Sequence, residues 1–425
     1  MTVFIFLGSL IGAMTFGMPI FFALLVCGVA LMGYSGTFES QILAQKLIDG
    51  ADNYPLMAIP FFLLAGEFMN AGGLSRRIVN AAMALIGHIR GGLGYVTIIA
   101  AIVLASLSGS AIADTAALAV LLLPLMRDAG YNVNRSAGLI ATAGIIAPVI
   151  PPSVGFVLFG VTAGVSITKL FLAGIAPGMM MGLALVATWW WLSRRESLEL
   201  PRRKTGREIA AAFVNATWAF VLPVIIIVGL KFGVFTPTEA GVVAASYALF
   251  ISVFVYRELS PAGIYDAFLA AAKTSAVIML LVAASLVSAW LITVANIPEQ
   301  IVTMLEPFMD NKILLMFVIM LLVIAVGAAL DFTPTILILT PVLMPVVKAA
   351  GIDPVYFGVL FIINNAIGLI TPPVGTVLNV VCGVGKLNMD DVIKGVVPFM
   401  IAETLLLFLF VLFPALVTVP AKFFH

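Results

Sequence analysis

Two segments, 144–153 and 364–374, place consecutive prolines among small and apolar residues, where an ordinary helix cannot continue. Proline lacks a backbone N–H and clashes with the preceding helical turn, and it disfavours helical geometry in the residue before it. We therefore expect a broken helix in each segment. The freed carbonyl oxygens are ready ligands for a cation such as sodium, and the N-terminus of the following half-helix offers N–H groups to an anion.

One carboxylate stands in each of two further apolar segments, Asp114 in 106–115 and Asp331 in 327–335. At membrane depth an acid costs roughly 3 kcal/mol, so it usually faces a cavity and serves a function. Each acid could instead cap a re-entrant helix, and the two roles are compatible. Hydroxyl groups that could act as further ligands stand at the same places: Ser108, Ser110, Thr115, Thr333 and Thr335.

The composition of the chain assigns these segments to a membrane. Of 425 residues, 63% are hydrophobic and 10% are charged, and the mean hydropathy of +1.20 lies far outside the range of soluble globular proteins. Apolar stretches of roughly 20 residues, the length that crosses a bilayer, recur along the chain and predict about ten to twelve crossings. The net charge of +1 provides no field that would attract nucleic acid. We expect an all-α polytopic membrane protein.

The broken-helix segments belong to an internal repeat, which is typical of transporters. An offset of 221 residues aligns the double proline at 151–152 with the double proline at 372–373. Slightly upstream the offset becomes 217 and pairs Asp114 with Asp331 and Pro124 with Pro341. Each half therefore carries an acid, a proline and a double proline in the same order.

A basic loop around Arg194, Arg195, Arg202 and Arg203 separates the two halves, and the positive-inside rule assigns this loop to the cytoplasm. We expect a first repeat over 1–193, a cytoplasmic linker over 194–212 and a second repeat over 213–425. Each repeat would hold scaffold helices, then a hairpin, then a broken helix. The second hairpin is expected near 327–335, and the broken helices are expected near 147–153 and 364–375.

At these residues the sequence resembles the large membrane subunit of tripartite ATP-independent periplasmic (TRAP) transporters, the DctM or SiaM type. The resemblance covers essentially the whole chain. It rests on four motifs, which are Ser-Leu-Ser-Gly-Ser-Ala-Ile-Ala-Asp-Thr-Ala from Ser106, Ile-Pro-Pro-Ser from Ile150, Phe-Thr-Pro-Thr-Glu-Ala-Gly from Phe235 and Ile-Thr-Pro-Pro-Val-Gly from Ile370.

The resemblance implies an ion-transporter fold of two inverted repeats with re-entrant hairpins and broken helices, in which a transport domain moves like an elevator. It implies Na⁺ as the driving ion and an organic acid, such as a C4-dicarboxylate or sialic acid, as the substrate. The partners would be a small four-helix membrane subunit and a periplasmic substrate-binding protein. Because the chain begins at the large subunit's first helix, we expect the small subunit as a separate chain. The location would be the bacterial inner membrane, with several crossings of the lipid bilayer.

The resemblance also carries over three sets of site residues, several of which would act through backbone carbonyls. The first sodium site would comprise Ser106, Ser108, Ser110, Ala147, Val149 and Pro151. The second sodium site would comprise Gly327, Asp331, Thr333, Gly368, Thr371 and Pro372. The residues near the substrate would be Ser110, Asp114, Ser153 and Asn365. Neither motif contains arginine or lysine, so helix N-termini and hydroxyl groups are expected to bind a substrate carboxylate.

Two other functions compete with coupled transport. An intramembrane serine protease could use Ser108, but it needs a base, and His88 and His425 have no partner in the sequence that would orient them. A passive channel could also use repeats and broken helices. We therefore expect a transporter rather than an enzyme, and uptake measurements separate coupled transport from conduction.

Overall fold

The computed structural model describes residues 2–36, 39–194 and 202–424, and all regular structure within these ranges is helical. In the first half the helices are α1 (Thr2–Thr15), α2 (Ile20–Ser35), α3 (Ser40–Ala51), the 3-10 turn η1 (Tyr54–Met57), α4 (Ala58–Ala71), α5 (Leu74–Ile86), α6 (Gly92–Ser108), α7 (Ala111–Asp128), α8 (Val133–Gly144), α9 (Val154–Ala163) and α10 (Ile167–Ser193).

The second half begins with α11 and has the same helical character. Its elements are α11 (Gly206–Lys231), α12 (Pro237–Phe250), the π-helical turn η2 (Ile251–Val255), α13 (Pro261–Val294), α14 (Ile297–Met309), α15 (Lys312–Gly327), α16 (Phe332–Ala349), α17 (Pro354–Gly368), α18 (Thr376–Gly385), α19 (Met389–Leu412) and α20 (Ala415–Phe424). The predicted all-α fold is therefore confirmed in the described ranges.

Seven helical stretches in the described parts of the chain are long and apolar enough to cross a membrane. They are Tyr54–Ala71, Ile167–Ser193, Gly206–Lys231, Pro237–Val255, Pro261–Val294, Phe332–Ala349 and Met389–Leu412. This is fewer than the roughly ten to twelve crossings expected from apolar length, because several apolar helices, namely α6, α9, α15, α17 and α18, have only 10–17 residues. The chain is a multi-pass membrane protein.

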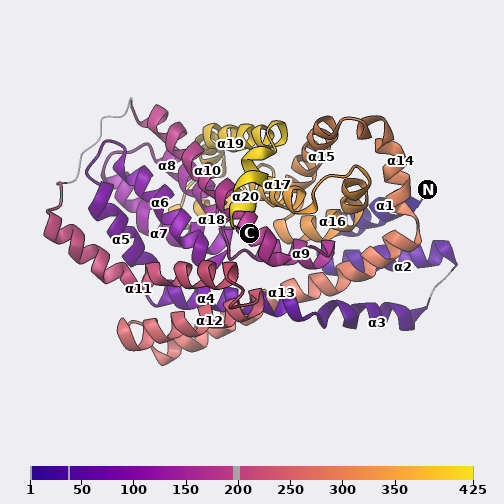
Figure 1. The fold of residues 1–425 in the computed structure, drawn as a ribbon, viewed down its shortest axis with the longest axis horizontal. Helices are drawn as coiled ribbons and strands as arrows, with labels where there is room; N and C mark the ends of the chain where they lie inside the picture. Colours follow the sequence, from indigo (N-terminus) through magenta and orange to yellow (C-terminus); the bar gives the residue numbers. More distant parts are fainter. Residues whose placement is uncertain (1, 37–38, 195–201, 425) are drawn as a thin grey trace.

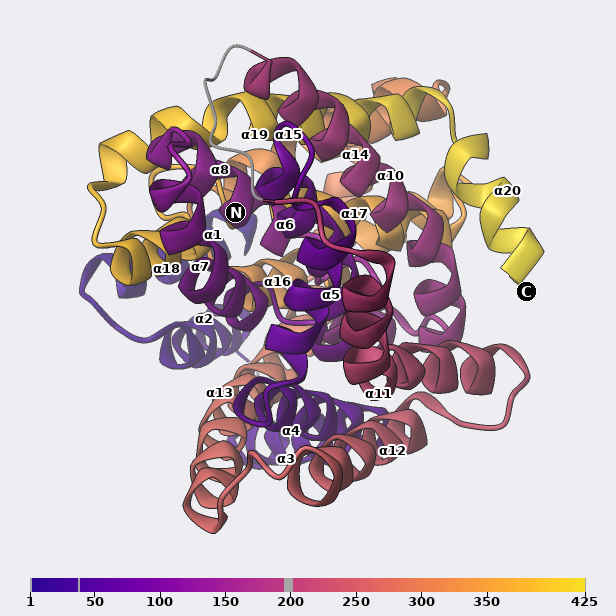
Figure 2. The same ribbon diagram turned by 90° about the vertical axis from the view of Figure 1, so that its left-hand side faces the viewer.

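The helices fall into two groups in space. Figures 1 and 2 both show α3, α4, α12 and α13 side by side along one edge of the molecule, and we call these four helices the flanking layer. The helices of the two predicted hairpins and broken helices, α6 to α9 and α15 to α18, lie above this layer in Figure 1. Helix α13 joins the groups, since it packs on α3 and α4 and also on α16, and α4 adds contacts to α6 and α9.

The hairpin and broken-helix segments of the two halves follow one another in the same order, α6 to α9 and α15 to α18. Helix α16 begins and ends 221 residues after α7, and both helices have 18 residues. Helical structure then stops between α8 and α9 and again between α17 and α18, and each gap contains a cis proline bond, at Pro151-Pro152 and at Pro372-Pro373.

These helix boundaries correct the offset of 217 residues that the sequence suggested upstream of the double prolines. With an offset of 221, Ser110 and Asp331 correspond as the N-cap residues of α7 and α16, and Pro124 corresponds to Pro345 rather than to Pro341. Asp114 lies one turn further along its helix than Asp331 does. The pairing of the two acids was therefore wrong by four residues, or about one helical turn. Residues four apart lie on the same face of a helix.

The junction between the halves lies partly outside the described residues. Helix α10 ends at Ser193, and the predicted linker over 194–212 includes 195–201, which the structure does not describe. Helix α11 already begins at Gly206, where Thr205 and Glu208 form a capping box. The last part of the predicted linker is thus helical.

Candidate functional site

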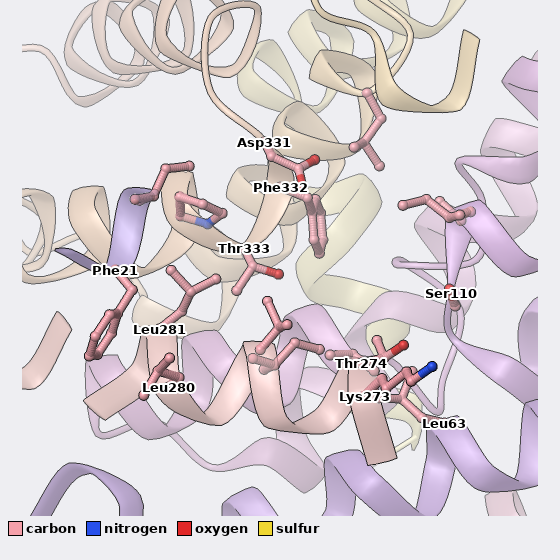
Figure 3. Close-up of a pocket in the computed structure, with 18 of the residues that line it drawn as sticks. Phe21, Leu63, Ser110, Lys273, Thr274, Leu280, Leu281, Asp331, Phe332 and Thr333 are labelled. Atoms are coloured by element: carbon pink, nitrogen blue, oxygen red, sulfur yellow. The ribbon is translucent and has the colours of Figure 1, made fainter. Parts of the chain in front are cut away.

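A pocket of about 700 Å³ lies where two hairpin tips approach α2 and α13. The first tip is the turn between α6 and α7, and the second tip is the turn between α15 and α16. Figure 3 shows Ser110 of the first half and Asp331, Phe332 and Thr333 of the second half facing this pocket, with Lys273 and Thr274 of α13 opposite. Its remaining walls are mostly apolar. The lining also includes Pro148 from the first break, between α8 and α9, and Leu369 from the second break, between α17 and α18. One cavity therefore brings together the tips and the breaks of both halves.

The first hairpin tip is held by hydrogen bonds among its own polar side chains. The Ser108 hydroxyl donates to the Asp114 carboxylate at 2.5 Å and accepts the backbone N–H of Ser110 at 3.1 Å. Ser110 caps α7 by accepting the N–H of Ala113 at 3.4 Å. The second carboxylate oxygen of Asp114 is buried without a partner in the described structure. The acid Asp114 and the N-cap residue Ser110 therefore lie within one helical turn of each other.

The first tip packs directly on the first break. Gly109 has a left-handed backbone, with φ of 62°, and a β-carbon on it would lie 2.2 Å from the Pro152 carbonyl oxygen. Only glycine fits this approach. Ser153, which caps α9 by accepting the N–H of Phe156, donates its hydroxyl to the Pro148 carbonyl. The predicted members of the first sodium site thus belong to two segments that touch.

The second tip meets the second break in a similar way. A β-carbon on Gly368 would lie 2.8 Å from the Gly327 carbonyl oxygen, which indicates close backbone contact between the end of α15 and the end of α17. The half-buried Asp331 carboxylate accepts a hydrogen bond from Thr376, the first residue of α18, at 3.3 Å. The Thr371 hydroxyl is used locally, since it donates to the Ile367 carbonyl at 2.8 Å.

The oxygen atoms at these two contacts fit a sodium ion, which prefers several uncharged oxygen ligands beside a carboxylate. Eight backbone carbonyls of the predicted sets accept no hydrogen bond within the described ranges, those of Ser106, Ser108, Ala147, Val149, Pro151, Gly327, Thr371 and Pro372. A buried carbonyl that lacks a partner costs free energy unless another group satisfies it. The donor set is therefore compatible with Na⁺, and Asp331 adds a negative charge at the second contact.

The four residues expected near the substrate do not all reach the pocket. Ser110 lines it, whereas Asp114, Ser153 and Asn365 are fully or almost fully buried and are not among its lining residues. Asn365 donates to the Phe361 carbonyl of its own helix at 2.8 Å, and its side-chain oxygen has no partner in the described structure. These three side chains are therefore buried in the protein and do not line the pocket.

Lys273 of α13 lines the pocket, and we did not predict it as a site residue. Lys273 lies outside the hairpin and broken-helix motifs of the sequence. A signal was nevertheless present, because Lys273 directly precedes the uncharged stretch 274–294 within the candidate span Pro261–Val294, and an ionisable residue in a membrane segment usually marks a functional site.

Long apolar helices, two broken-helix segments and a shared pocket with polar tips define a membrane transporter. The chain belongs to the family described as "Tripartite ATP-independent periplasmic transporter, DctM component", which matches residues 7–416. The resemblance inferred from the motifs at Ser106, Ile150, Phe235 and Ile370 is thereby confirmed.

Three relatives cover most of the chain. It is 57% identical over 425 residues, 100% of both chains, to the 2,3-diketo-L-gulonate TRAP transporter large permease protein YiaN of Escherichia coli (strain K12). It is 37% identical, over 95% of each chain, to the sialic acid TRAP transporter large permease protein SiaM of Vibrio cholerae. It is 35% identical to the C4-dicarboxylate TRAP transporter large permease protein DctM of Pseudomonas aeruginosa, over 88% of this chain and 87% of the relative. All three are named as permeases, which confirms a transporter rather than an enzyme.

A solved structure shares the fold without close sequence similarity. The Alcanivorax borkumensis YdaH transporter superposes with a TM-score of 0.60 at 15% identity, over 87% of this chain and 86% of that chain. This similarity supports the architecture of the membrane helices alone.

Proposed function

We propose that this chain is the sodium-coupled permease of a TRAP system and moves an organic acid anion through the pocket between the two hairpin tips and α13. The observation that carries the proposal is that one cavity is lined by both tips and both breaks. Three relatives are named for acids, which are 2,3-diketo-L-gulonate, sialic acid and C4-dicarboxylates. The substrate of this chain would belong to the same broad class.

Sodium would bind at the contacts where each hairpin tip meets its break. The carbonyl oxygens that lack partners, together with Asp331, supply a suitable donor set. When bound there, Na⁺ would neutralise the carboxylate of Asp331 and hold the second tip against the second break. The protein's own part is to keep these oxygens oriented before the ion arrives, which the Thr376 to Asp331 hydrogen bond supports.

The motion would be of the elevator type, with α6 to α9 and α15 to α18 moving against the flanking layer. The grouping of α3, α4, α12 and α13 along one edge of the molecule in Figures 1 and 2 supports this division. The pocket lies at the boundary between the two groups, since α13 supplies one wall and the hairpin tips supply the other. A bound anion would then be carried with the tips while α13 stays in place.

Two further components would complete the system, as the word tripartite in the family description indicates. We propose a separate small four-helix membrane subunit and a periplasmic binding protein that delivers the acid. The complex would lie in the bacterial inner membrane.

The test is uptake of labelled acid into proteoliposomes that contain this chain, the small subunit and the binding protein. The three acids named above serve as probes. We expect accumulation above the external concentration only with an inward sodium gradient. Accumulation that persists without the gradient would overturn sodium coupling, and equilibration without accumulation would favour a passive channel.

A further inference from the structure

Lys273 is a charged side chain in an otherwise weakly polar part of the pocket. It is the basic residue among those that line the cavity, and its neighbours there include the apolar side chains of Val277, Ile278 and Leu281 on the same helix. Within the described ranges no ion pair or hydrogen bond involves its ammonium group, and the side chain is exposed. Figure 3 shows it beside Thr274, on the side of the pocket opposite Asp331.

The position of Lys273 is costly unless a negative partner reaches it. A lysine in a membrane helix is costly unless its ammonium group reaches water or a cavity, and such residues usually face cavities and pair with charges. The pocket holds one carboxylate, that of Asp331, but this group already accepts the Thr376 hydroxyl across the second tip. The lysine therefore lacks a dedicated partner, and an anion that enters the pocket can supply one.

We propose that Lys273 binds the carboxylate of the transported acid and that the pocket selects acids with a single carboxylate. This inference rests on the proposed function. The remaining polar groups of the lining, the hydroxyls of Ser110, Thr274 and Thr333, suit the neutral oxygens of a polyhydroxy or keto acid. A second carboxylate would find no further cationic side chain among the lining residues and would meet the negative charge of Asp331.

An acid bound to Lys273 would also connect the flanking layer to the helices of the hairpin tips. Lys273 belongs to α13, whereas Ser110, Asp331 and Thr333 belong to the hairpin tips. An acid held between them would touch both groups in this conformation. Its release would require the carboxylate to leave the lysine, so the charge pair would influence both binding and the onset of movement.

Uptake into proteoliposomes tests the role of Lys273. The variants are Lys273→Gln, Lys273→Arg and the control Lys348→Gln, which removes an exposed lysine at the end of α16 outside the pocket. We expect Lys273→Gln to raise the acid concentration for half-maximal uptake at least about tenfold, the size of one charge-assisted hydrogen bond. The arginine variant should recover most of this loss, and Lys348→Gln should match the wild type. Wild-type half-saturation in Lys273→Gln would overturn the proposal.

A second measurement separates charge recognition from a merely structural role. Binding of 2,3-diketo-L-gulonate and of its neutral amide to the purified membrane complex is compared by calorimetry. The wild type should prefer the acid, and Lys273→Gln should lose the preference. A variant that takes up less acid but keeps the preference would contradict the assignment. Better wild-type uptake of succinate than of the single-carboxylate acids would contradict the selectivity.

The uptake measurement distinguishes failure of the proposed function from failure of the role assigned to Lys273. If wild-type proteoliposomes accumulate none of the three acids, the proposed function is overturned, and the role of Lys273 is overturned with it. If the wild type accumulates an acid and Lys273→Gln does so equally well, only the role of Lys273 is overturned.

Discussion

Ser110 and Asp331 occupy equivalent positions in the two halves, as the N-cap residues of the matched helices α7 and α16. Both line the same pocket, but one presents a hydroxyl group and the other a carboxylate. Ser110 caps its helix through the N–H of Ala113, whereas the Asp331 side chain makes no capping bond and binds Thr376 instead. The same N-cap position therefore holds a neutral hydroxyl in the first half and a negative carboxylate in the second half.

Replacing Ser110 by Asp separates helix capping from recognition of the anion. Aspartate and serine are comparable N-caps, so the Ser110→Asp variant should melt near the wild-type temperature. Its added charge should repel an acid in the pocket and raise the half-saturating concentration at least about tenfold. The Ser110→Ala variant should instead lose about 1 kcal/mol of stability. Thermal melting and uptake together check both expectations, and normal uptake by Ser110→Asp would show that no anion binds near this cap.

Removing the charge of Asp331 should weaken the response to sodium. Asparagine keeps the shape and can still accept the Thr376 hydroxyl, but it cannot neutralise a cation. We expect Asp331→Asn to raise the sodium concentration for half-maximal uptake about tenfold, which corresponds to about 1.4 kcal/mol. The control is Asp128→Asn, which changes an exposed acid at the end of α7. An unchanged sodium dependence in Asp331→Asn would remove this residue from the ion site.

The contact between the first tip and the first break can be tested at Gly109. A β-carbon there would lie 2.2 Å from the Pro152 carbonyl oxygen, so Gly109→Ala should force the tip away from the break and abolish most uptake. Gly164 is a matched control, because its φ of 67° is similar and a β-carbon would meet nothing within 4 Å. Both variants bear the backbone cost of a left-handed residue, about 1–2 kcal/mol. Equal uptake by the two variants would show that the contact has no role in transport.

The contact between the second tip and the second break can be tested at Gly368, with Gly327 in the same contact as the control. A β-carbon on Gly368 would lie 2.8 Å from the Gly327 carbonyl oxygen, whereas a β-carbon on Gly327 would lie 3.7 Å from its nearest neighbour, an ordinary contact. We expect Gly368→Ala to lose sodium-dependent uptake and Gly327→Ala to retain most of it. The opposite order would refute the close packing seen between α15 and α17.

A cluster outside the membrane spans predicts a dependence of stability on pH. Glu258 accepts hydrogen bonds from Arg76 at 2.9 Å and from Arg77 at 2.7 Å, and the Arg77 guanidinium lies over the Tyr256 ring. Burial alone would raise the pKa of Glu258, but the two arginines outweigh it and lower the pKa below its ordinary value. A lowered pKa means that the stabilisation is present at neutral pH and is lost as the pH falls through that pKa.

The measurement is the melting temperature of Glu258→Gln against the wild type over a pH series. We expect the variant to melt lower at pH 7 and the difference to shrink in acid, because protonation removes the charge from wild-type Glu258. A difference that is independent of pH would show that packing, rather than the charge of the carboxylate, stabilises this junction. Arg76 is more than half exposed, so most of the effect should come from Arg77.

The sequence was informative about backbone breaks and less informative about register. Double prolines are local signals, since each removes donors and fixes its own geometry, and helical structure is indeed interrupted at both. The pairing of Asp114 with Asp331 relied on residue identity alone and was wrong by about one turn. Helix boundaries depend on capping and packing, and these boundaries make Ser110 and Asp331 the equivalent N-cap residues of α7 and α16.

The wall that α13 contributes to the pocket could not be predicted from the repeat. Lys273 lies far from both hairpin motifs in sequence, and only the packing of α13 against α16 brings it to the tips. The burial of Asp114, Ser153 and Asn365 also depends on tertiary packing. Motifs identified the segments, whereas the direction of each side chain followed from how the segments meet.

The length of α13 relates the protein to the thickness of its bilayer. Its 34 residues rise about 51 Å at 1.5 Å per residue, whereas the hydrocarbon core is only about 30 Å thick. The helix must therefore incline or extend past the acyl chains, and a thicker membrane would stand it more upright. Because Lys273 is carried on this helix, the acyl-chain length of the surrounding lipid would set the depth and angle at which the lysine meets the hairpin tips.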